Sequence, residues 1–303
     1  MMRIIYVLFI CIVFCTQISS TFSSNGPSEF KIVTSFSLLE NWINILTRNI
    51  PAEVAVISTK SLVPIKSDPH VYQITPMDAK ALEEANLIIT IGLSFECWMS
   101  NFASPSSAHT TLFQASKGVE ARLLPAPDPH LWHDVQKVRQ MIKNISSVLC
   151  EKLPKAATII SNNARAYDAE LVKLDAWIRS KISKTPREKR KIITTHDAFY
   201  YYGKAYGVTF NAPVGLSTEA EADSKTVALL INQIKAENIK AIFFENLANR
   251  NIIRQIADET GIKIQADDLL YADSLSEEGG VAYDYIALMK HNTSFMTEAL
   301  LRE

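Results

Sequence analysis

One long amphipathic pattern constrains the fold of this chain more than any other feature. Between positions 154 and 184, apolar residues recur in steps of mostly four and three, and polar residues fill the remaining positions. That spacing predicts a single helix with one apolar stripe. At 1.5 Å per residue the helix is roughly 45 Å long, which exceeds the width of a small lobe. It either lies across two lobes of one chain or pairs with a partner helix in a coiled coil. The stripe consists of Ile160, Ala164, Tyr167, Leu171, Leu174, Ile178 and Ile182.

The segments on both sides of this helix alternate between strand and helix patterns. Such alternation predicts mostly parallel sheets covered by helices on both faces. A capping box with proline at the first helical position begins one of the helices at Thr75. The predicted strands are 30–34, 54–58, 87–91, 191–195, 208–210, 241–244 and 262–265, and the predicted helices are 38–46, 75–85, 134–152, 198–206, 224–237, 252–260 and 283–301. We therefore expect an α/β fold with an N-terminal lobe at 25–153, the backbone helix at 154–184 and a C-terminal lobe at 185–303.

The first residues have the pattern of an export signal. Arg3 is the only charge before an entirely apolar run at 4–15, and small and polar residues follow it. The run is shorter than the ~20 residues that span a bilayer, although an uncleaved anchor is the alternative. We expect a signal peptide at 1–24. Cys11 and Cys15 follow Ile10 and Phe14 rather than small residues, so we expect no lipid anchor.

Composition excludes several functions. The net charge is −1, which argues against a nucleic-acid binder. The chain contains no G-x-G-x-x-G, no P-loop and no G-x-S-x-G, so nucleotide binding by those loops and α/β-hydrolase chemistry lose their usual support. Two cysteines remain after the signal peptide, Cys97 and Cys150. These two cysteines could form a disulfide. We favour a buried free thiol at Cys150 instead, because this residue lies on an apolar helical stripe.

The tripeptide Asp-Pro-His occurs twice in a chain that has only six histidines. It ends at His70 and at His130. Proline fixes its own φ and favours an extended conformation for the preceding residue, so each histidine is displayed on a stiff loop. A stiff loop lowers the entropic cost of holding a metal ligand in place. Asp68 and Asp128 are expected to close turns rather than to bind metal.

Two further ligand candidates, His196 and Asp273, follow predicted strands of the C-terminal half. Ligands of open α/β sheets bind outside the carboxyl ends of strands. Three imidazoles and one carboxylate suit a divalent cation such as Zn²⁺ or Mn²⁺. Taken singly, each histidine also fits a structural role and Asp273 also fits a helix N-cap.

Other titratable residues have weaker support as site residues. Glu245 and Asp197 either orient a ligand histidine or form ordinary loop hydrogen bonds. His133 either shares the metal with His130 or only begins a helix, and we favour the latter. His109 and His291 are expected to lie on the surface.

These motifs together resemble the zinc- and manganese-binding solute-binding proteins of bacterial ABC importers, the zinc-uptake complex component A family. The resemblance covers nearly all of the mature chain. It implies two lobes joined by one rigid helix and one metal between them, with His70, His130, His196 and Asp273 as ligands. The matching segments are Asp-Pro-His-Val-Tyr at 68–72, Gly-Leu-Ser-Phe-Glu at 92–96, Asp-Pro-His-Leu-Trp at 128–132, Thr-His-Asp-Ala-Phe at 195–199, Ala-Ile-Phe-Phe-Glu at 241–245 and Tyr-Ala-Asp-Ser at 271–274.

The resemblance predicts a periplasmic binding protein rather than an enzyme. It implies a membrane permease as partner, one Mn²⁺ or Zn²⁺ ion as cargo and a monomeric chain. Many zinc-specific relatives carry a long histidine-rich loop between the first two ligands, whereas 92–127 contains only His109, which favours manganese. The alternatives are a surface adhesin and a zinc hydrolase. The hydrolase uses His130, His133 and Asp273 as ligands, with Glu245 or Asp197 as general base.

Overall fold

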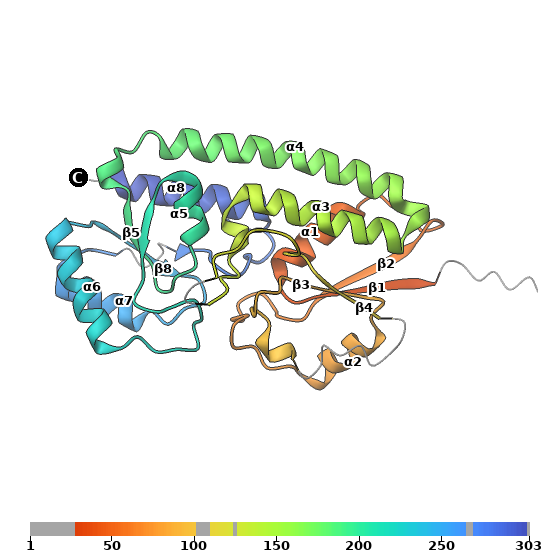
Figure 1. The fold of residues 1–303 in the computed structure, drawn as a ribbon, viewed down its shortest axis with the longest axis horizontal. Coiled ribbons are helices and arrows are strands. Elements are labelled where there is room, and N and C mark those ends of the chain that lie inside the picture. The colour runs from red at the N-terminus through yellow and green to blue at the C-terminus, as the bar shows by residue number, and fades with distance from the viewer. Residues whose placement is uncertain (1–27, 101–109, 124–125, 265–268, 302–303) are drawn as a thin grey trace, which may run out of the picture.

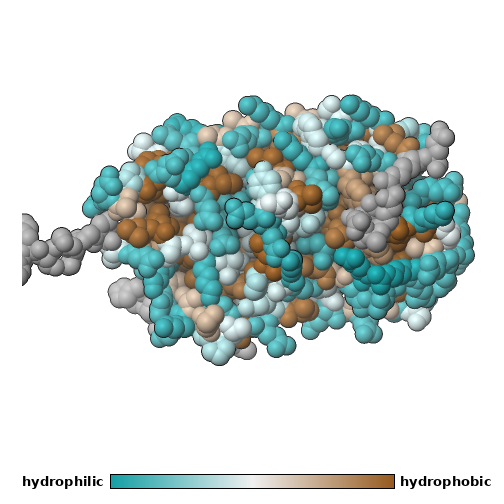
Figure 2. All heavy atoms as spheres, turned by 180° about the vertical axis from the view of Figure 1, so that it is seen from behind, coloured by the Kyte–Doolittle hydropathy of each residue, from teal (hydrophilic) through white to brown (hydrophobic). Residues whose placement is uncertain are grey.

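The computed structural model describes residues 28–100, 110–123, 126–264 and 269–301. The predicted signal peptide at 1–24 and His109 lie outside these residues. Within the described ranges, no helix combines the length and the apolar character needed to cross a bilayer. Seen from behind, the surface is largely hydrophilic, with apolar atoms in scattered groups (Figure 2).

The N-terminal half contains a parallel four-stranded sheet in the order β2-β1-β3-β4. Helices α1 and α3 cover one face of this sheet and α2 lies on the other (Figure 1). Helix α2 begins with the predicted capping box, in which the Thr75 side chain accepts from the backbone N–H of Asp78. The elements are β1 (Glu29–Thr34), α1 (Ser37–Thr47), β2 (Val56–Ser61), α2 (Pro76–Glu84), β3 (Leu87–Thr90), a 3₁₀ turn (Cys97–Met99), β4 (Thr111–Gln114), a second 3₁₀ turn (Leu131–His133) and α3 (Val135–Lys152).

The C-terminal half contains a parallel three-stranded sheet in the order β6-β5-β7 and a parallel pair, β8 and β9. Phe243 separates β7 from β8, and its backbone N–H still donates to the carbonyl of Ile193 in the neighbouring strand. The elements are a 3₁₀ turn (Arg187–Lys189), β5 (Lys191–Ile193), α5 (Tyr200–Tyr206), β6 (Thr209–Asn211), α6 (Ser224–Glu237), β7 (Ala241–Ile242), β8 (Phe244–Glu245), α7 (Asn251–Thr260), β9 (Leu269–Leu270) and α8 (Tyr285–Leu301).

One predicted strand is placed wrongly. Residues 262–264 form no strand, and the chain pairs later, at β9. The apolar side chains of Ile262 and Ile264 instead pack against the cluster beneath α6 and α7. An apolar run therefore marks burial here without marking strand pairing.

The long helix is α4 (Ala157–Ile182), which follows a 3₁₀ turn (Pro154–Ala156) and is about 39 Å long. It packs against α1 and α3 at one end and against α8 and α5 at the other (Figure 1). The predicted stripe is buried within the chain, apart from the half-buried Ala164, so the helix needs no coiled-coil partner. The structure therefore confirms an α/β fold of two lobes joined by one backbone helix.

The two halves share one apolar core. The Trp132 indole N–H donates to the carbonyl of Ala272 at 2.8 Å, and the Tyr285 hydroxyl donates to the carbonyl of Trp132 at 2.8 Å. The backbone N–H of Leu275 donates to the Ser37 hydroxyl in α1. These contacts fix the segment after β9 against the N-terminal half.

Both cysteines of the described chain are free. Cys97 is exposed and Cys150 is half-buried, with its Sγ 3.4 Å from the Ser161 Oγ. The free thiol predicted at Cys150 is confirmed, but it is less buried than its apolar stripe suggested.

Candidate metal centre

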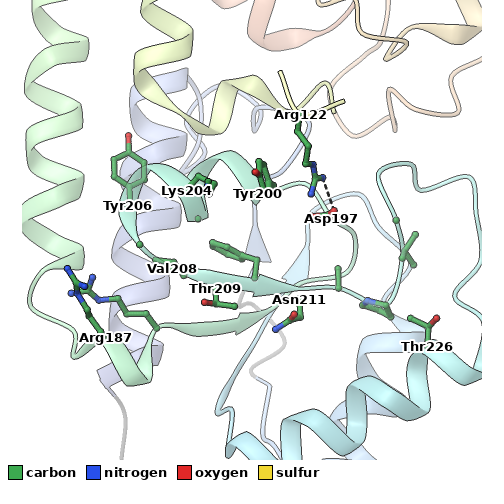
Figure 3. Close-up of a pocket in the computed structure, with 18 of the residues that line it drawn as sticks. Arg122, Arg187, Asp197, Tyr200, Lys204, Tyr206, Val208, Thr209, Asn211 and Thr226 are labelled. Atoms are coloured by element: carbon green, nitrogen blue, oxygen red, sulfur yellow. Dashed lines mark hydrogen bonds and ion pairs between the residues drawn. The ribbon is translucent and has the colours of Figure 1, made fainter. Parts of the chain in front are cut away.

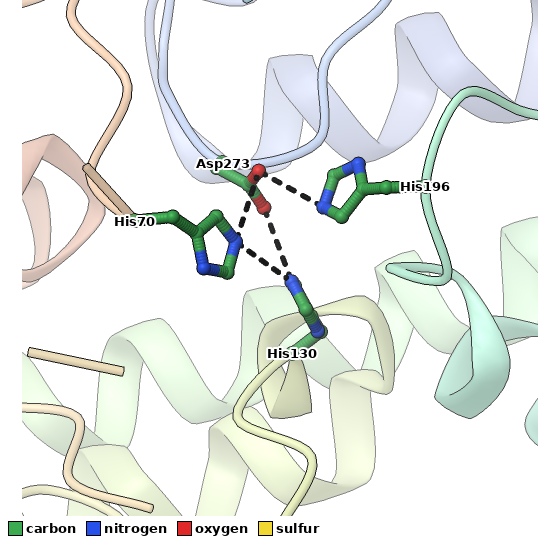
Figure 4. Close-up of side chains that lie close together, drawn as sticks. All are labelled: His70, His130, His196 and Asp273. Carbon is green, nitrogen blue, oxygen red and sulfur yellow. Dashed lines mark hydrogen bonds and ion pairs between the residues drawn. The ribbon is translucent and has the colours of Figure 1, made fainter. Parts of the chain in front are cut away.

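Four side chains that are distant in the sequence converge where the two halves meet (Figure 4). They are His70, His130, His196 and Asp273, and one potential ligand atom from each lies within 4.8 Å of all the others. The Nε2 atoms of His70 and His130 are 3.3 Å apart. The Asp273 carboxylate lies 3.2 Å from Nε2 of His196 and 3.6 Å from Nε2 of each of the other two histidines.

The fold brings these residues together at the carboxyl ends of its strands. His70 lies between β2 and α2, and His130 immediately precedes the 3₁₀ turn at Leu131–His133. His196 follows β5, and Asp273 follows β9. Carboxyl ends of parallel strands share one edge of a sheet, so two sheets facing each other form a site between them. His70 is the least buried of the four residues.

The carboxylate of Asp128 orients His130. Its Oδ1 accepts from the His130 backbone N–H at 3.1 Å and from the ring Nδ1 at 2.9 Å. A carboxylate that accepts from Nδ1–H leaves the lone pair of Nε2 directed at the cluster. The predicted turn at Asp128 is therefore present, and its carboxylate also contacts the imidazole, which the sequence does not predict.

Asp68 occupies the same place in the other Asp-Pro-His motif and acts differently. Its Oδ1 accepts from the backbone N–H of His70 at 2.9 Å, and its Oδ2 accepts from the Thr218 hydroxyl at 2.6 Å. The predicted turn is confirmed, and the carboxylate connects the loop of His70 to the C-terminal half. No signal in the tripeptide itself distinguishes the two aspartates.

Glu245 lies behind His196. Its Oε2 contacts Nδ1 of the imidazole, and its Oε1 accepts from the backbone N–H groups of Thr195 and His196 at 2.7 and 3.1 Å. Nε2 of His196 consequently faces the cluster. Asp197 touches none of the four side chains, and its carboxylate instead pairs with Arg122 at 2.8 Å.

The charges of the cluster are unbalanced without a cation. Burial raises the pKa of Asp273, but His196 and His70 outweigh burial and hold that pKa well below 3.8. Burial also opposes protonation of His196, yet Glu245 and Asp273 raise its pKa well above 6.5. Within the described residues, Nε2 of His196 and Oδ1 of Asp273 are buried and have no hydrogen-bond partner. Buried polar atoms are normally paired, so these two atoms fit coordination of an ion.

His133 does not join the cluster. Its ring is fully buried, and the centre of that ring lies 4.4 Å from the centre of the Phe199 ring. Burial lowers the pKa of His133 to about 3. His291, expected on the surface, is half-buried instead, because its Nε2 contacts the carbonyl of Leu269 at 3.0 Å and its ring stacks on Phe295.

The cluster offers three imidazole nitrogens and one carboxylate, a set of donors that suits a first-row divalent metal. A hydrolase site needs a coordination position that is left open for water. The alternative set of His130, His133 and Asp273 is not assembled, because the His133 ring lies against Phe199. The geometry gives no support to the hydrolase hypothesis.

The chain is similar to known proteins whose names refer to metal binding or metal transport. The manganese-binding lipoprotein MntA of Halalkalibacterium halodurans is 30% identical over 283 residues, which cover 92% of this chain and 91% of the relative. The manganese ABC transporter substrate-binding lipoprotein PsaA of Streptococcus pneumoniae is 28% identical over 309 residues, covering 97% and 96%. The periplasmic zinc-binding protein TroA of Treponema pallidum superposes with a TM-score of 0.84 at 26% identity, over 90% of this chain and 100% of that one.

These relatives also correct one prediction. We expected no lipid anchor, whereas the curated relatives are named lipoproteins, so that expectation is contradicted. The family described as "Zinc-uptake complex component A periplasmic" matches residues 32–299, which is most of the chain. The chain therefore belongs to the zinc-uptake complex component A family.

Proposed function

We propose that this protein is the extracytoplasmic binding component of an ABC importer, and that it captures one Mn²⁺ or Zn²⁺ ion and delivers it to a membrane permease. The ligands are His70, His130, His196 and Asp273. One observation supports this most strongly: four donors from both halves converge, and two of their buried atoms lack any other partner in the described chain. The names of the relatives, an ABC transporter substrate-binding lipoprotein and a periplasmic zinc-binding protein, support the same function.

Binding explains the site better than catalysis does. Four protein ligands fill a tetrahedral coordination sphere and leave no position for an attacking water. Glu245, the proposed general base of a hydrolase, is committed to His196 and two backbone N–H groups. Delivery requires only that the ligands separate, which two lobes can do without covalent chemistry. The protein acts as a monomer whose lobes comprise 25–153 and 185–303, with the backbone helix at 154–184 between them.

Manganese is the proposed cargo. The curated relatives reported above are named for manganese, and the chain has no histidine-rich stretch between His70 and His130. Zn²⁺ nevertheless binds nitrogen-rich sites more tightly than Mn²⁺ does in the general affinity order. We therefore expect tighter binding of Zn²⁺ in vitro, with the transported ion decided by availability and geometry in the periplasm.

The test is metal analysis of the exported protein purified without chelators, followed by calorimetric titration of the metal-free protein. We expect one Mn²⁺ or Zn²⁺ per chain. Thermal unfolding should shift upward with Mn²⁺ and Zn²⁺, by a free energy of about 2.7 kcal/mol when free metal is 100 times its Kd. A larger shift with Ca²⁺ or Mg²⁺ indicates an all-oxygen site and contradicts the proposal.

A further inference from the structure

One guanidinium group pairs with two aspartates, one from each half of the chain. Nη2 of Arg122 is 2.7 Å from Oδ2 of Asp128 and 2.8 Å from Oδ2 of Asp197. Arg122 and Asp197 line one end of an open cavity of about 1100 Å³ (Figure 3). The Asp128 side chain is fully buried, and that of Arg122 is 18% exposed. A buried carboxylate needs such a partner, because an unpaired charge in the interior is costly.

Each aspartate is connected directly to one proposed ligand. The Asp128 carboxylate holds both the ring and the backbone of His130. Asp197 follows His196 in the chain, and its backbone N–H donates to the carbonyl of Gly215 at 3.1 Å. Arg122 therefore links the loop that positions His130 to the loop that positions His196.

Arg122 is itself held from both sides. Its backbone carbonyl accepts from the Asp128 N–H at 2.9 Å, and its backbone N–H donates to the Tyr201 hydroxyl at 2.9 Å. That hydroxyl donates in turn to the carbonyl of Asp128 at 2.8 Å. The guanidinium lies 4.1 Å from the centre of the Tyr200 ring, a distance typical of a cation–π contact. Both tyrosines belong to α5, so the arginine contacts the C-terminal half through three side chains.

We propose that Arg122 is a positioning residue that sets how long the metal stays bound. This inference rests on the proposed function. Release of the ion requires His130 and His196 to separate, and the Asp128–Arg122–Asp197 bridge resists that separation. The contact with Asp197 is a charge-assisted hydrogen bond, which is about twice as strong as a neutral one. The Asp128 carboxylate is buried, so its ion pair with Arg122 is protected from screening. Arg122 acts through the two loops and never touches the ion.

The experiment measures Mn²⁺ dissociation by chelator chase in the full chain and in variants of the bridge. Arg122→Gln should accelerate dissociation by about 10- to 100-fold, the range for residues that orient metal ligands. Asp197→Asn removes only the pair between Arg122 and the residue that follows His196. It should accelerate Mn²⁺ dissociation by about 3- to 10-fold, since the buried pair of Arg122 with Asp128 remains. The double variant should match Arg122→Gln, because both changes break one bridge. Arg122→Lys should restore part of the residence time.

A matched ion pair outside the site provides the control. Arg139 and Asp168 join α3 to α4 at 2.6 and 2.9 Å, with side chains 25% and 29% exposed. Arg139→Gln should leave the dissociation rate within twofold of the parent, a margin below the loss typical of residues that orient ligands. The electron paramagnetic resonance spectrum of bound Mn²⁺ should change in Arg122→Gln and not in Arg139→Gln, which separates ligand positioning from a general loss of stability.

Two results overturn the inference alone: parent-like dissociation in both Arg122→Gln and Asp197→Asn, or effects that add independently in the double variant. If Arg122→Gln fails to fold, Asp197→Asn and Arg122→Lys still decide, because both keep a cation beside Asp128. A parent protein that binds neither Mn²⁺ nor Zn²⁺ overturns the proposed function and this inference together.

Discussion

The two sides of the candidate site hold their histidines in different electrostatic settings. Behind His130, the Asp128 carboxylate is neutralised by Arg122. Behind His196, the Glu245 carboxylate accepts only from the imidazole and backbone N–H groups in the described chain, with no Lys or Arg beside it. Burial lowers the pKa of His130 despite Asp128, whereas Glu245 and Asp273 raise the pKa of His196 despite burial.

Because of this difference, the two histidines have different protonation states in the metal-free protein. His130 is already neutral at neutral pH and is ready to coordinate. His196 binds a proton in the metal-free protein, and that proton must leave before the metal is coordinated. The proton on His196 offsets part of the negative charge of Asp273 and Glu245 until the cation replaces it.

The largest expected effect is on metal affinity, and it distinguishes His196 from His133, the histidine that could also have shared the metal. His196→Ala removes one of four ligands and should reduce metal affinity by far more than 100-fold, beyond the range for residues that only orient ligands. His133→Leu should stay within tenfold of the parent, because that ring packs on Phe199 outside the cluster. Calorimetric titration with Mn²⁺ and Zn²⁺ compares them, and circular dichroism checks both folds. Loss of binding in His133→Leu with retention in His196→Ala contradicts the site.

The next effect compares the two orienting carboxylates. Glu245→Gln keeps the size of the side chain but removes its charge, and it should weaken metal binding by about 10- to 100-fold. Asp128→Asn should weaken binding by a similar factor for a different reason, because it leaves the Arg122 cation without its buried partner. Adding Arg122→Gln to each variant distinguishes these causes. Arg122→Gln should cause little further loss of metal affinity in Asp128→Asn, and it should add its own loss to that of Glu245→Gln.

The pH dependence of binding follows from the raised pKa of His196. Below that pKa the metal must displace a proton, so affinity should fall by about tenfold per pH unit of acidification. The fall should begin above pH 6.5, the ordinary histidine value. Glu245→Gln should lower the pKa of His196 and move the onset to lower pH, whereas Asp128→Asn should leave the onset in place. Identical onsets in the parent and Glu245→Gln contradict the different roles of the two histidines.

The last effect concerns the stability of the metal-free fold rather than metal binding. The pKa of His133 falls from 6.5 to about 3 on folding, so its contribution is complete above pH 6.5 and is lost as the pH falls. Between about pH 6 and 4, His133 should lower the free energy of unfolding by about 1.4 kcal/mol for each pH unit of acidification. Urea unfolding measures the free energy of unfolding at each pH. In His133→Leu this free energy should depend less steeply on pH than in the parent, by that amount per pH unit. An unchanged slope indicates that His133 is not a neutral buried histidine. His196 acts oppositely, since its raised pKa stabilises the fold at low pH.

The sequence predicts the scaffold well where local pattern and burial coincide. The stripe of the long helix, the capping box at Thr75 and the strand that ends before His196 all follow from the spacing of apolar residues and from the capping residues. The failures are non-local. In the segment predicted as a strand, Ile262 and Ile264 pack against the cluster beneath α6 and α7, and the strand that pairs is Leu269–Leu270.

The details of the site depend on partners that spacing cannot supply. Asp68 and Asp128 stand in the same tripeptide, yet one reaches Thr218 and the other reaches an imidazole and Arg122. His133 is three residues from His130 but faces Phe199. Only the packing of the two halves decides these orientations.

X-ray absorption of the Zn²⁺-loaded protein tests the central claim most directly. We expect a first coordination sphere of nitrogen and oxygen at about 2.0–2.1 Å, with outer scattering from three imidazoles and none from sulfur. His196→Ala should reduce the signal to two imidazoles. A parent spectrum with sulfur scattering, or one dominated by oxygen without imidazole features, contradicts the site formed by His70, His130, His196 and Asp273.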